Sequence, residues 1–491
     1  MKYYSTRDKS NIVTAAQAIV QGLASDGGLF VPETIPNVTI SDIEALCKMD
    51  YRERAVAIMS MYLDEFSQDE LRSFVRDAYA DNYDNADIAP TTFLSDNTAV
   101  LELWHGPTCA FKDMALQMLP RLLTASLKKL GEERKVCILV ATSGDTGKAA
   151  LEGFADVKDT SIVVFYPRDG VSDVQKLQMT TQCGKNVFVS AVEGNFDDAQ
   201  TGVKMIFSDR EFAKKLDEKG VFLSSANSIN WGRLLPQLVY YFSAYCDYVN
   251  SGKIKMGDEI DFCVPTGNFG DILAGWYAKK MGLPVRRLIC ASNRNNVLTD
   301  FINTGVYDRK REFFATISPS MDILVSSNLE RLLFMLSDDT SVNTWMNELK
   351  TVGKYDVGEK VLSDIQADFD GGFTSDIDAK ACISKLFNDT GYLMDTHTAD
   401  AYAVLSNMRK LGEAFPTVIV STASPYKFAD SVLEALGEDS VKSGAELINK
   451  LSAVTGTTAP KPLTGLDGRA VRFTDCTAKE VMPDVVLRFL D

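Results

Sequence analysis

The sequence predicts an α/β fold in which mainly parallel sheets are flanked by helices, with a helical region at the N-terminus. Two observations carry this prediction. Short apolar runs alternate with helical segments from about residue 93 onward, and turns rich in Gly, Ser and Thr follow several of these runs. Strands buried on both faces read as continuous apolar runs, and strands that alternate with helices usually pair in parallel.

Residues 1–92 form the first expected unit, a mostly helical N-terminal domain. Apolar side chains recur there at helical spacing over residues 14–23 and 69–79. The α/β core is expected over residues 93–491 and consists of two subdomains. Residues 305–390 interrupt its alternation with acidic, Gly-containing helical segments, and we interpret them as a helical insert. A chain of 491 residues is long enough for two or three packed units.

The same patterns predict the individual elements of the core. Expected strands cover residues 136–141, 161–166, 186–192, 260–264, 285–291 and 418–421. Expected helices cover residues 173–182, 230–248, 272–282 and about 429–436.

The composition disfavours several classes of function. Lys and Arg number 51 against 67 Asp and Glu, a net charge of −16 that disfavours binding to nucleic acid or anionic membranes. The polar start of the chain does not resemble a signal peptide. No apolar run approaches 18 residues, so we expect no transmembrane helix. The nine cysteines are scattered without a C-x-x-C pair, as expected for reduced thiols in a cytoplasmic protein. With two histidines and no zinc-type cysteine spacing, we expect no metal site.

Three turns between a strand and a helix have the composition of anion-binding sites. They are residues 265–271 (PTGNFGD), 142–147 (TSGDTG) and 421–425 (STASP). Backbone N–H groups point outward at the start of a helix, and the helix dipole adds positive potential there. None matches a Walker A or G-x-G-x-x-G nucleotide motif. Each has a structural alternative: the first is a simple turn, and Asp145 or the hydroxyls of residues 421–425 cap a helix.

A fourth segment, residues 105–113 (HGPTCAFKD), places a lysine after an aromatic residue at the start of a helix. Lys112 is by itself most simply a surface lysine. If it is packed against apolar groups near a helix N-terminus, its charged form is disfavoured and its amine is prepared to attack an aldehyde.

Together these segments resemble the fold-type II pyridoxal-phosphate enzymes, whose fold is tryptophan synthase β-like, and within them the longer-chain class of threonine synthases. The resemblance extends over nearly the whole chain. Its segments occur in the family's order: AIVQGLASDGGLFVPETIP, LWHGPTCAFKD, ATSGDTGKAA, NSINWGRLLPQ, PTGNFGDILAG, SPSMDI and DTHTADAYAV.

The resemblance implies a role for each matching residue. Lys112 is the catalytic lysine that holds pyridoxal 5'-phosphate covalently and then moves protons. Thr422 places its hydroxyl near the pyridine nitrogen. The cofactor phosphate is expected at Gly267, Asn268, Phe269, Gly270 and Asp271. The substrate is expected at Thr142, Ser143, Gly144, Asp145, Thr146, Asn230 and Arg233. The carboxylate of Asp271 repels a phosphate unless it points away.

The implied reaction converts O-phospho-L-homoserine and water to L-threonine and phosphate, without an obligate protein partner. Arg233, Lys148, Lys427 and Asn230 are candidates to bind the leaving phosphate, each with an alternative structural role. His105 either lines the site or is a structural histidine. Three alternatives stay open. They are a threonine dehydratase or cysteine-synthase-like enzyme of the same fold, a catalytically silent ligand-binding relative, and a kinase-like phosphate binder, which the missing Walker A loop disfavours.

Overall fold

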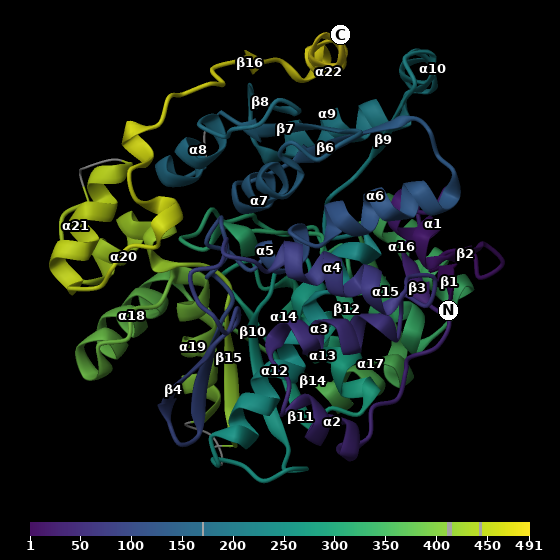
Figure 1. The fold of residues 1–491 in the computed structure, drawn as a ribbon. Coiled ribbons are helices and arrows are strands. Elements are labelled where there is room, and N and C mark those ends of the chain that lie inside the picture. Colours follow the sequence, from purple (N-terminus) through teal and green to yellow (C-terminus); the bar gives the residue numbers. More distant parts are fainter. Residues whose placement is uncertain (169–170, 410–414, 441–443) are drawn as a thin grey trace.

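The computed structural model of the chain describes residues 1–168, 171–409, 415–440 and 444–491. Its core contains two sheets with mainly parallel strands, which confirms the predicted fold class (Figure 1). In the larger sheet only β4 is antiparallel to its neighbour. This sheet has the order β14 (Phe369–Phe373), β11 (Val285–Ser292), β10 (Ile260–Pro265), β15 (Thr417–Ser421), β5 (Thr98–Glu102) and β4 (Thr91–Ser95).

The smaller sheet is parallel throughout. Its strand order is β16 (Cys476–Thr477), β8 (Val187–Val192), β7 (Thr160–Pro167), β6 (Lys135–Ala141) and β9 (Val221–Ser224). The central strands are buried because helices cover both faces. All residues of β10 are buried, as are all of β6 after its first. These runs lack the polar alternation of a half-exposed strand, which is why they could be predicted.

The N-terminal region combines helices with a small antiparallel sheet of order β2-β1-β3. Its strands are β1 (Lys2–Ser5), β2 (Ile12–Thr14) and β3 (Phe30–Pro32), and its helices are α1 (Ala15–Gln21), α2 (Ile40–Leu46), α3 (Tyr51–Ser60) and α4 (Gln68–Ala78). Each helix begins with a capping box, in which the N-cap side chain and the third helical residue bond reciprocally.

The helix expected over residues 230–248 is divided in two. A short α11 (Trp231–Leu234) precedes α12 (Gln237–Asn250), and Pro236 is the N-cap of α12. Proline has no N–H to continue the helical hydrogen bonds and its ring crowds the preceding turn. The prediction of one continuous helix was therefore wrong.

Residues 305–390 are mostly helical and also hold three strands. A two-stranded antiparallel sheet pairs β12 (Val306–Asp308) with β13 (Lys354–Asp356). The helices of this region are α14 (Val297–Thr304), α15 (Leu329–Leu336), α16 (Asp339–Thr351), α17 (Gly358–Asp368) and α18 (Asp376–Thr390). The third strand, β14, pairs in parallel with β11 at the edge of the larger sheet. This stretch is therefore continuous with the core sheet.

Helices that follow strands of the two sheets pack against one another between the sheets (Figure 1). α5 (Asp113–Leu116) packs against α7 (Asp145–Phe154), which follows β6. α13 (Gly270–Met281) follows β10, and α19 (Thr396–Arg409) packs against β10, β11 and β15. The other helices are α6 (Leu119–Leu130), α8 (Asp173–Thr180), α9 (Phe196–Ser208), α10 (Arg210–Glu218), α20 (Ala429–Ala435), α21 (Ala445–Thr455) and α22 (Met482–Leu490).

No helix within the described residues has the length and apolar character needed to cross a membrane.

Candidate active site

Lys112 is buried at the start of α5. It is therefore not the surface lysine that the sequence alone would suggest. Its Nζ lies 3.2 Å from Asp145 Oδ2, 3.4 Å from Ser320 Oγ and 4.5 Å from the centre of the Phe111 ring. Burial lowers the pKa of Lys112, and the charge of Lys427 lowers it further, although Asp145 opposes both. The amine is therefore closer to its neutral, nucleophilic form than a surface lysine.

The loop before Lys112 is fixed to the turn after β15. Phe111 N donates to Thr422 O over 2.8 Å, and Ser424 N donates to Cys109 O over 3.1 Å. Thr422 itself is buried, and its chain segment therefore lies directly beside that of the lysine. Residues 105–113 and 421–425 were expected in one site, and the structure brings them together.

Asp145 is held by two lysines and a glutamine. Its Oδ1 accepts from Lys427 Nζ at 2.7 Å and from Gln175 Nε2 at 2.8 Å, while Oδ2 faces Lys112. Burial alone would raise the pKa of Asp145, but the two ammonium groups hold it well below its usual range. The N-cap of α7 is Gly144, without a side-chain cap, so Asp145 does not cap the helix. Its carboxylate is a counter-ion for the two lysines.

In the turn over residues 142–147, one hydroxyl accepts backbone hydrogen bonds within the turn, and two others have no partner among the described residues. Thr142 Oγ1 accepts from Gly144 N at 3.0 Å and Gly147 N at 2.9 Å, and so shapes the turn. Ser143 and Thr146 are half-buried, and their hydroxyls make no hydrogen bond to any described residue. These two hydroxyls are available to a ligand.

In the loop between β10 and α13, two backbone carbonyls accept hydrogen bonds from side chains, whereas three backbone N–H groups have no acceptor among the described residues. Gly267 O accepts from Ser326 Oγ at 2.9 Å, and Asn268 O accepts from Asn328 Nδ2 at 3.0 Å. The N–H groups of Gly267, Asn268 and Phe269 donate to no described residue. At Gly267 a Cβ would lie 2.5 Å from Ser320 O, so only glycine fits. Free amides at the start of a helix of 12 residues form an anion site.

Asp271, in the first turn of α13, is turned toward α12. Its Oδ1 accepts from Tyr240 Oη at 2.6 Å and Tyr241 Oη at 2.9 Å. Its Oδ2 is buried and has no hydrogen-bond partner among the described residues. Burial raises the pKa of Asp271 to about 6, against the effect of the two tyrosine hydrogen bonds. The carboxyl group is therefore protonated at higher pH than an ordinary aspartate, and only its protonated form does not repel a nearby phosphate.

Among the candidates for binding a leaving phosphate, Arg233 retains unused donors. It is buried, donates from Nη1 to Ala226 O at 2.7 Å, and has a buried Nε with no partner among the described residues. Burial lowers its pKa to about 10. A buried guanidinium without a carboxylate partner among those residues suits an incoming anion.

The other candidates are engaged within the protein. Asn230 caps α11 through Gly232 N at 2.8 Å and donates to Ile19 O at 2.9 Å. Lys148 pairs with Glu152 at 2.7 Å and also contacts Gln182. Lys427 is directed to Asp145, as described above. These contacts match the structural alternatives raised for Asn230 and Lys148.

Two further groups near Lys112 were not assigned by sequence analysis. Ser320 lies beside the amine, and its backbone N–H donates to His397 Nε2 at 3.3 Å. His397 Nδ1 in turn lies 2.8 Å from Asp395 Oδ2. Both occur in segments, SPSMDI and DTHTADAYAV, that carried the family resemblance, and this was the available signal.

His105 has a structural environment. Its two ring nitrogens lie 2.6 Å from Asp84 Oδ1 and 2.9 Å from Glu102 Oε2, and its ring stacks on Trp104. Burial lowers its pKa, but the two carboxylates prevail and raise it to about 9. His105 is thus a cation within an acidic pair and has no free nitrogen for catalysis.

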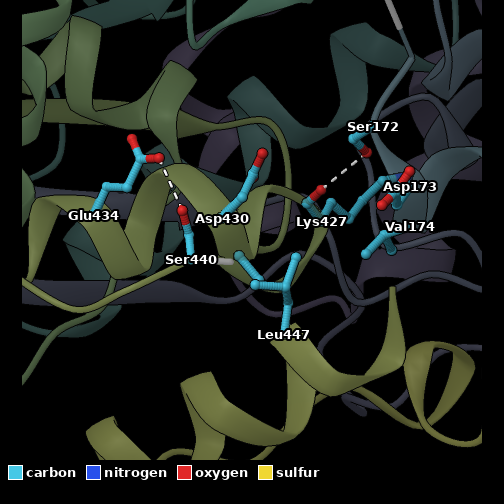
Figure 2. A pocket seen from close by; sticks show the side chains of 9 residues that line it. Ser172, Asp173, Val174, Lys427, Asp430, Glu434, Ser440 and Leu447 are labelled. Carbon is cyan, nitrogen blue, oxygen red and sulfur yellow. Dashed lines mark hydrogen bonds between the residues drawn. The ribbon is translucent and has the colours of Figure 1, made fainter. Parts of the chain in front are cut away.

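A pocket of about 220 Å³ opens between α8 and α20, and its lining includes part of Lys427 (Figure 2). Figure 2 shows Asp173, Asp430 and Glu434 along this pocket, and Ser172 bonded to the backbone of Lys427. The ammonium group of Lys427 is turned away to Asp145 and Thr108 O. An acidic wall does not suit a phosphorylated ligand, so this pocket is distinct from the site around Lys112.

The fold, the buried lysine and the anion-binding loop define a fold-type II pyridoxal-phosphate enzyme. The family model "Pyridoxal-phosphate dependent enzyme" matches residues 98–424. The models "Threonine synthase N terminus" and "Threonine synthase, C-terminal" match residues 2–79 and 398–485. The chain belongs to the threonine synthase family.

Known proteins share this architecture. The chain is 42% identical over 433 residues to human "Threonine synthase-like 1", covering 86% of this chain and 58% of that protein. Its identity to threonine synthase of Saccharomyces cerevisiae is 38% over 465 residues, with 88% and 89% of the two chains covered. The crystal structure of a PLP-bound threonine synthase from Brucella melitensis superposes with a TM-score of 0.88 at 38% identity, covering 100% of this chain and 99% of that one. The chain thus spans little more than half the length of the human relative.

The residues present fit pyridoxal 5'-phosphate. Lys112 supplies a buried amine of lowered pKa, and the loop over residues 266–270 supplies three free N–H groups for a phosphate. The absence of a Cβ at Gly267 leaves the loop close to Ser320, the neighbour of Lys112.

Proposed function

We propose that this chain is a threonine synthase, which converts O-phospho-L-homoserine and water to L-threonine and phosphate. The observation that carries the proposal is the placing of Lys112. Its amine contacts Asp145 from the turn over residues 142–147, and Ser320 beside the loop over residues 266–270. One lysine thus lies between a site for an amino-acid carboxylate and a site for the cofactor phosphate.

When bound, pyridoxal phosphate supplies an electron sink for the charge left at Cα of the substrate. Residues of the chain move the protons and orient the substrate. Lys112 Nζ would hold the cofactor, and its amine of lowered pKa would serve as the base that takes the Cα proton. The hydroxyls of Ser143 and Thr146, with the amides at the start of α7, orient the substrate carboxylate.

Loss of phosphate from Cγ needs a cation that is not already neutralised. Arg233 fits this role because it is buried and retains guanidinium donors without a carboxylate partner among the described residues. It stabilises the negative charge that develops on the departing phosphate. Phosphate can leave Cγ only if a proton is also lost from Cβ. A proton would then return to Cγ, water would add its hydroxyl group at Cβ, and a final proton, returned to Cα by Lys112, would give L-threonine.

His397 and Asp395 position Ser320. The imidazole accepts from Ser320 N, and Asp395 fixes the orientation of the imidazole ring. Ser320 Oγ is thereby held beside Lys112 Nζ, where its hydroxyl can share the proton that the amine moves. We assign these three residues to positioning and Lys112 to proton transfer.

The site chemistry is consistent with action on a small phosphorylated amino acid. The nine scattered cysteines, as expected for reduced thiols, support action in the cytoplasm. A threonine dehydratase uses the same cofactor attachment but needs no anion site for a leaving phosphate. The uncompensated Arg233 favours the synthase.

The test is to incubate the cofactor-loaded protein with O-phospho-L-homoserine and follow phosphate and threonine together. Equal amounts of both products support the proposal, and Lys112→Ala must abolish them together with the visible absorbance of the bound cofactor. Threonine without phosphate would overturn the mechanism. An oxo acid and ammonia released from threonine, with no turnover of the phosphorylated substrate, would instead identify a dehydratase.

A further inference from the structure

Cys47 and Cys246 meet where the N-terminal region contacts the core. Cys47 is the C-cap of α2, and α2 packs against α12, which carries Cys246 (Figure 1). Asn250 Nδ2 donates to Cys47 O at 2.9 Å. Asn250 lies four residues after Cys246 and therefore on the same face of α12. Arg54 donates to Leu46 O and pairs with Asp247, and these two residues are the sequence neighbours of Cys47 and Cys246, so the two cysteines lie close together.

The two thiols differ in exposure. Cys47 is partly exposed to solvent, whereas Cys246 is fully buried behind it. A dissolved oxidant can therefore reach Cys47 before it reaches Cys246, its neighbour across the contact between α2 and α12. This is the arrangement of an attacking thiol and a resolving thiol.

The charges around the pair favour a thiolate on Cys47. The nearby Cys246 thiol lowers the pKa of Cys47, and the positive charge of Arg54 lowers it further, against burial, Asp247 and Glu44. Arg54 is fixed here by Leu46 O at 2.9 Å and by Asp247 Oδ1 at 3.6 Å. The nearby Cys47 thiol, followed by burial, raises the pKa of Cys246. One thiol is thus the nucleophile and the other the proton donor.

Six of the other seven cysteines lack this combination. Burial raises the thiol pKa of Cys109, Cys137, Cys263 and Cys290. Cys183 and Cys476 are exposed and serve as internal references for ordinary thiols.

We propose that Cys47 and Cys246 are a redox-active pair, which a peroxide converts to a disulfide joining α2 to α12. Cys47 Sγ attacks one peroxide oxygen, the O–O bond breaks, and hydroxide leaves to give a sulfenic acid on Cys47. Cys246 Sγ then attacks Cys47 Sγ, the S–O bond breaks, and the hydroxide leaves as water with the proton of Cys246. In total, two thiols and one hydrogen peroxide give one disulfide and two waters.

The disulfide would bear on the active site through α12. The same helix carries Tyr240 and Tyr241, whose hydroxyls hold Asp271 in the first turn of α13. A bond from α2 to Cys246, on the turn that follows Tyr240 and Tyr241, restricts movement of this helix. The pair itself is independent of the proposed reaction, and its chemistry can be tested without substrate.

The experiment treats the full-length protein with hydrogen peroxide, blocks the remaining thiols, and maps peptides by mass spectrometry without reductant. We expect a peptide pair joined through Cys47 and Cys246, the loss of two of the nine thiols, and recovery of both with dithiothreitol. In Cys246→Ser the reaction should stop at a sulfenic acid on Cys47, which dimedone traps. Cys183→Ser is the matched control and should leave the disulfide unchanged.

Two results would overturn the proposal. One is that Cys47 and Cys246 stay reduced under conditions that oxidise Cys183 and Cys476. The other is that dimedone labels Cys47 no faster than those exposed thiols in Cys246→Ser. Circular dichroism of each variant shows whether the fold is retained, and the labelling of Cys47 in the wild-type protein decides the question even if a variant fails to fold.

Discussion

At the residue scale, the charge state of Lys112 depends on Asp145, whose carboxylate pairs with both Lys112 and Lys427. One carboxylate faces two ammonium groups, so the site carries an excess positive charge before any ligand binds. Lys427 takes Asp145 Oδ1 at 2.7 Å, which leaves the longer contact of 3.2 Å to Lys112. Lys112 is thereby only partly compensated, and its neutral form is favoured.

Lys427→Met should therefore raise the pKa of Lys112, because a neighbouring positive charge is removed and Asp145 then has a single ammonium partner. Lys112 attacks the cofactor aldehyde only as the neutral amine, so uptake at neutral pH should slow and its pH profile move upward. Adding cofactor to the cofactor-free protein and following visible absorbance over a pH range measures this. Lys148→Met, which removes the partner of Glu152, should leave the profile in place. An unchanged profile in Lys427→Met would refute the assignment.

Asp271 gives a second prediction at this scale. Its pKa of about 6 means that it loses its proton within the working pH range. Above that pH a carboxylate lies beside the proposed phosphate site, so cofactor affinity should fall as pH rises through about 6. Asp271→Asn stays neutral and should remove this step. Cofactor titrations monitored by fluorescence at several pH values measure it, and a step that persists in Asp271→Asn would contradict the prediction.

The residues of the site were predictable only in part. Residues 142–147, 265–271 and 421–425 could be found because Gly, Ser and Thr after an apolar run mark an anion-binding turn. The partners of Asp145 could not be found in this way. Gln175 and Lys427 belong to distant segments, and their side chains meet Asp145 only after both sheets and their helices are in place.

At the element scale, buried strands were the most predictable part of the fold. The run expected over residues 260–264 is β10, and the run expected over 285–291 is β11, each one residue longer. β14 escaped prediction because it contains Gly371 and Gly372, which are poor strand formers. These glycines are needed for packing: a Cβ at Gly372 would lie 2.6 Å from Val404 Cγ1. Tertiary contact here overrides local propensity.

Helix packing around Lys112 yields a third prediction. Gly153 in α7 lies so close to α5 that a Cβ would be 2.1 Å from Leu116 O. Gly153→Ala should therefore push α7 away from the helix that begins at Lys112, with a loss of roughly 1–3 kcal/mol in the free energy of unfolding. Urea unfolding measures the loss, and weaker cofactor binding should accompany it.

The matched control is Gly202→Ala in α9. Its Cβ would meet Met482 Sδ at 2.2 Å, but a methionine side chain can move aside, whereas a backbone carbonyl in a helix cannot. If both variants lose equal stability, the close approach of α7 to α5 is not the cause.

At the scale of the whole molecule, the N-terminal region and the α/β part share one hydrophobic core. A single cluster of buried side chains includes Tyr3, Tyr62, Trp231 and Val420. Trp231 has ring contacts of 5.4 Å with Tyr3 and 5.6 Å with Tyr62. The expected helical unit over residues 1–92 is therefore packed into the rest of the chain.

Polar contacts tie the same two parts to the cofactor loop. Arg331 is fully buried and donates from Nε to Phe30 O at 2.9 Å, while another guanidinium nitrogen donates to Asn328. Asn328 in turn donates to Asn268 O in the loop over residues 266–270. A carbonyl of β3 is thus linked through two side chains to the proposed phosphate site.

These contacts predict that the chain unfolds in one cooperative transition, in which the N-terminal region does not melt separately. Because the ring contacts of Trp231 and the bridge by Arg331 both join that region to the core, its loss exposes apolar surface and disrupts the cofactor loop together. Unfolding by urea should therefore give coincident curves for tryptophan fluorescence, far-ultraviolet circular dichroism and cofactor absorbance. Loss of helical signal well before loss of cofactor absorbance would show instead that residues 1–92 behave as an independent unit.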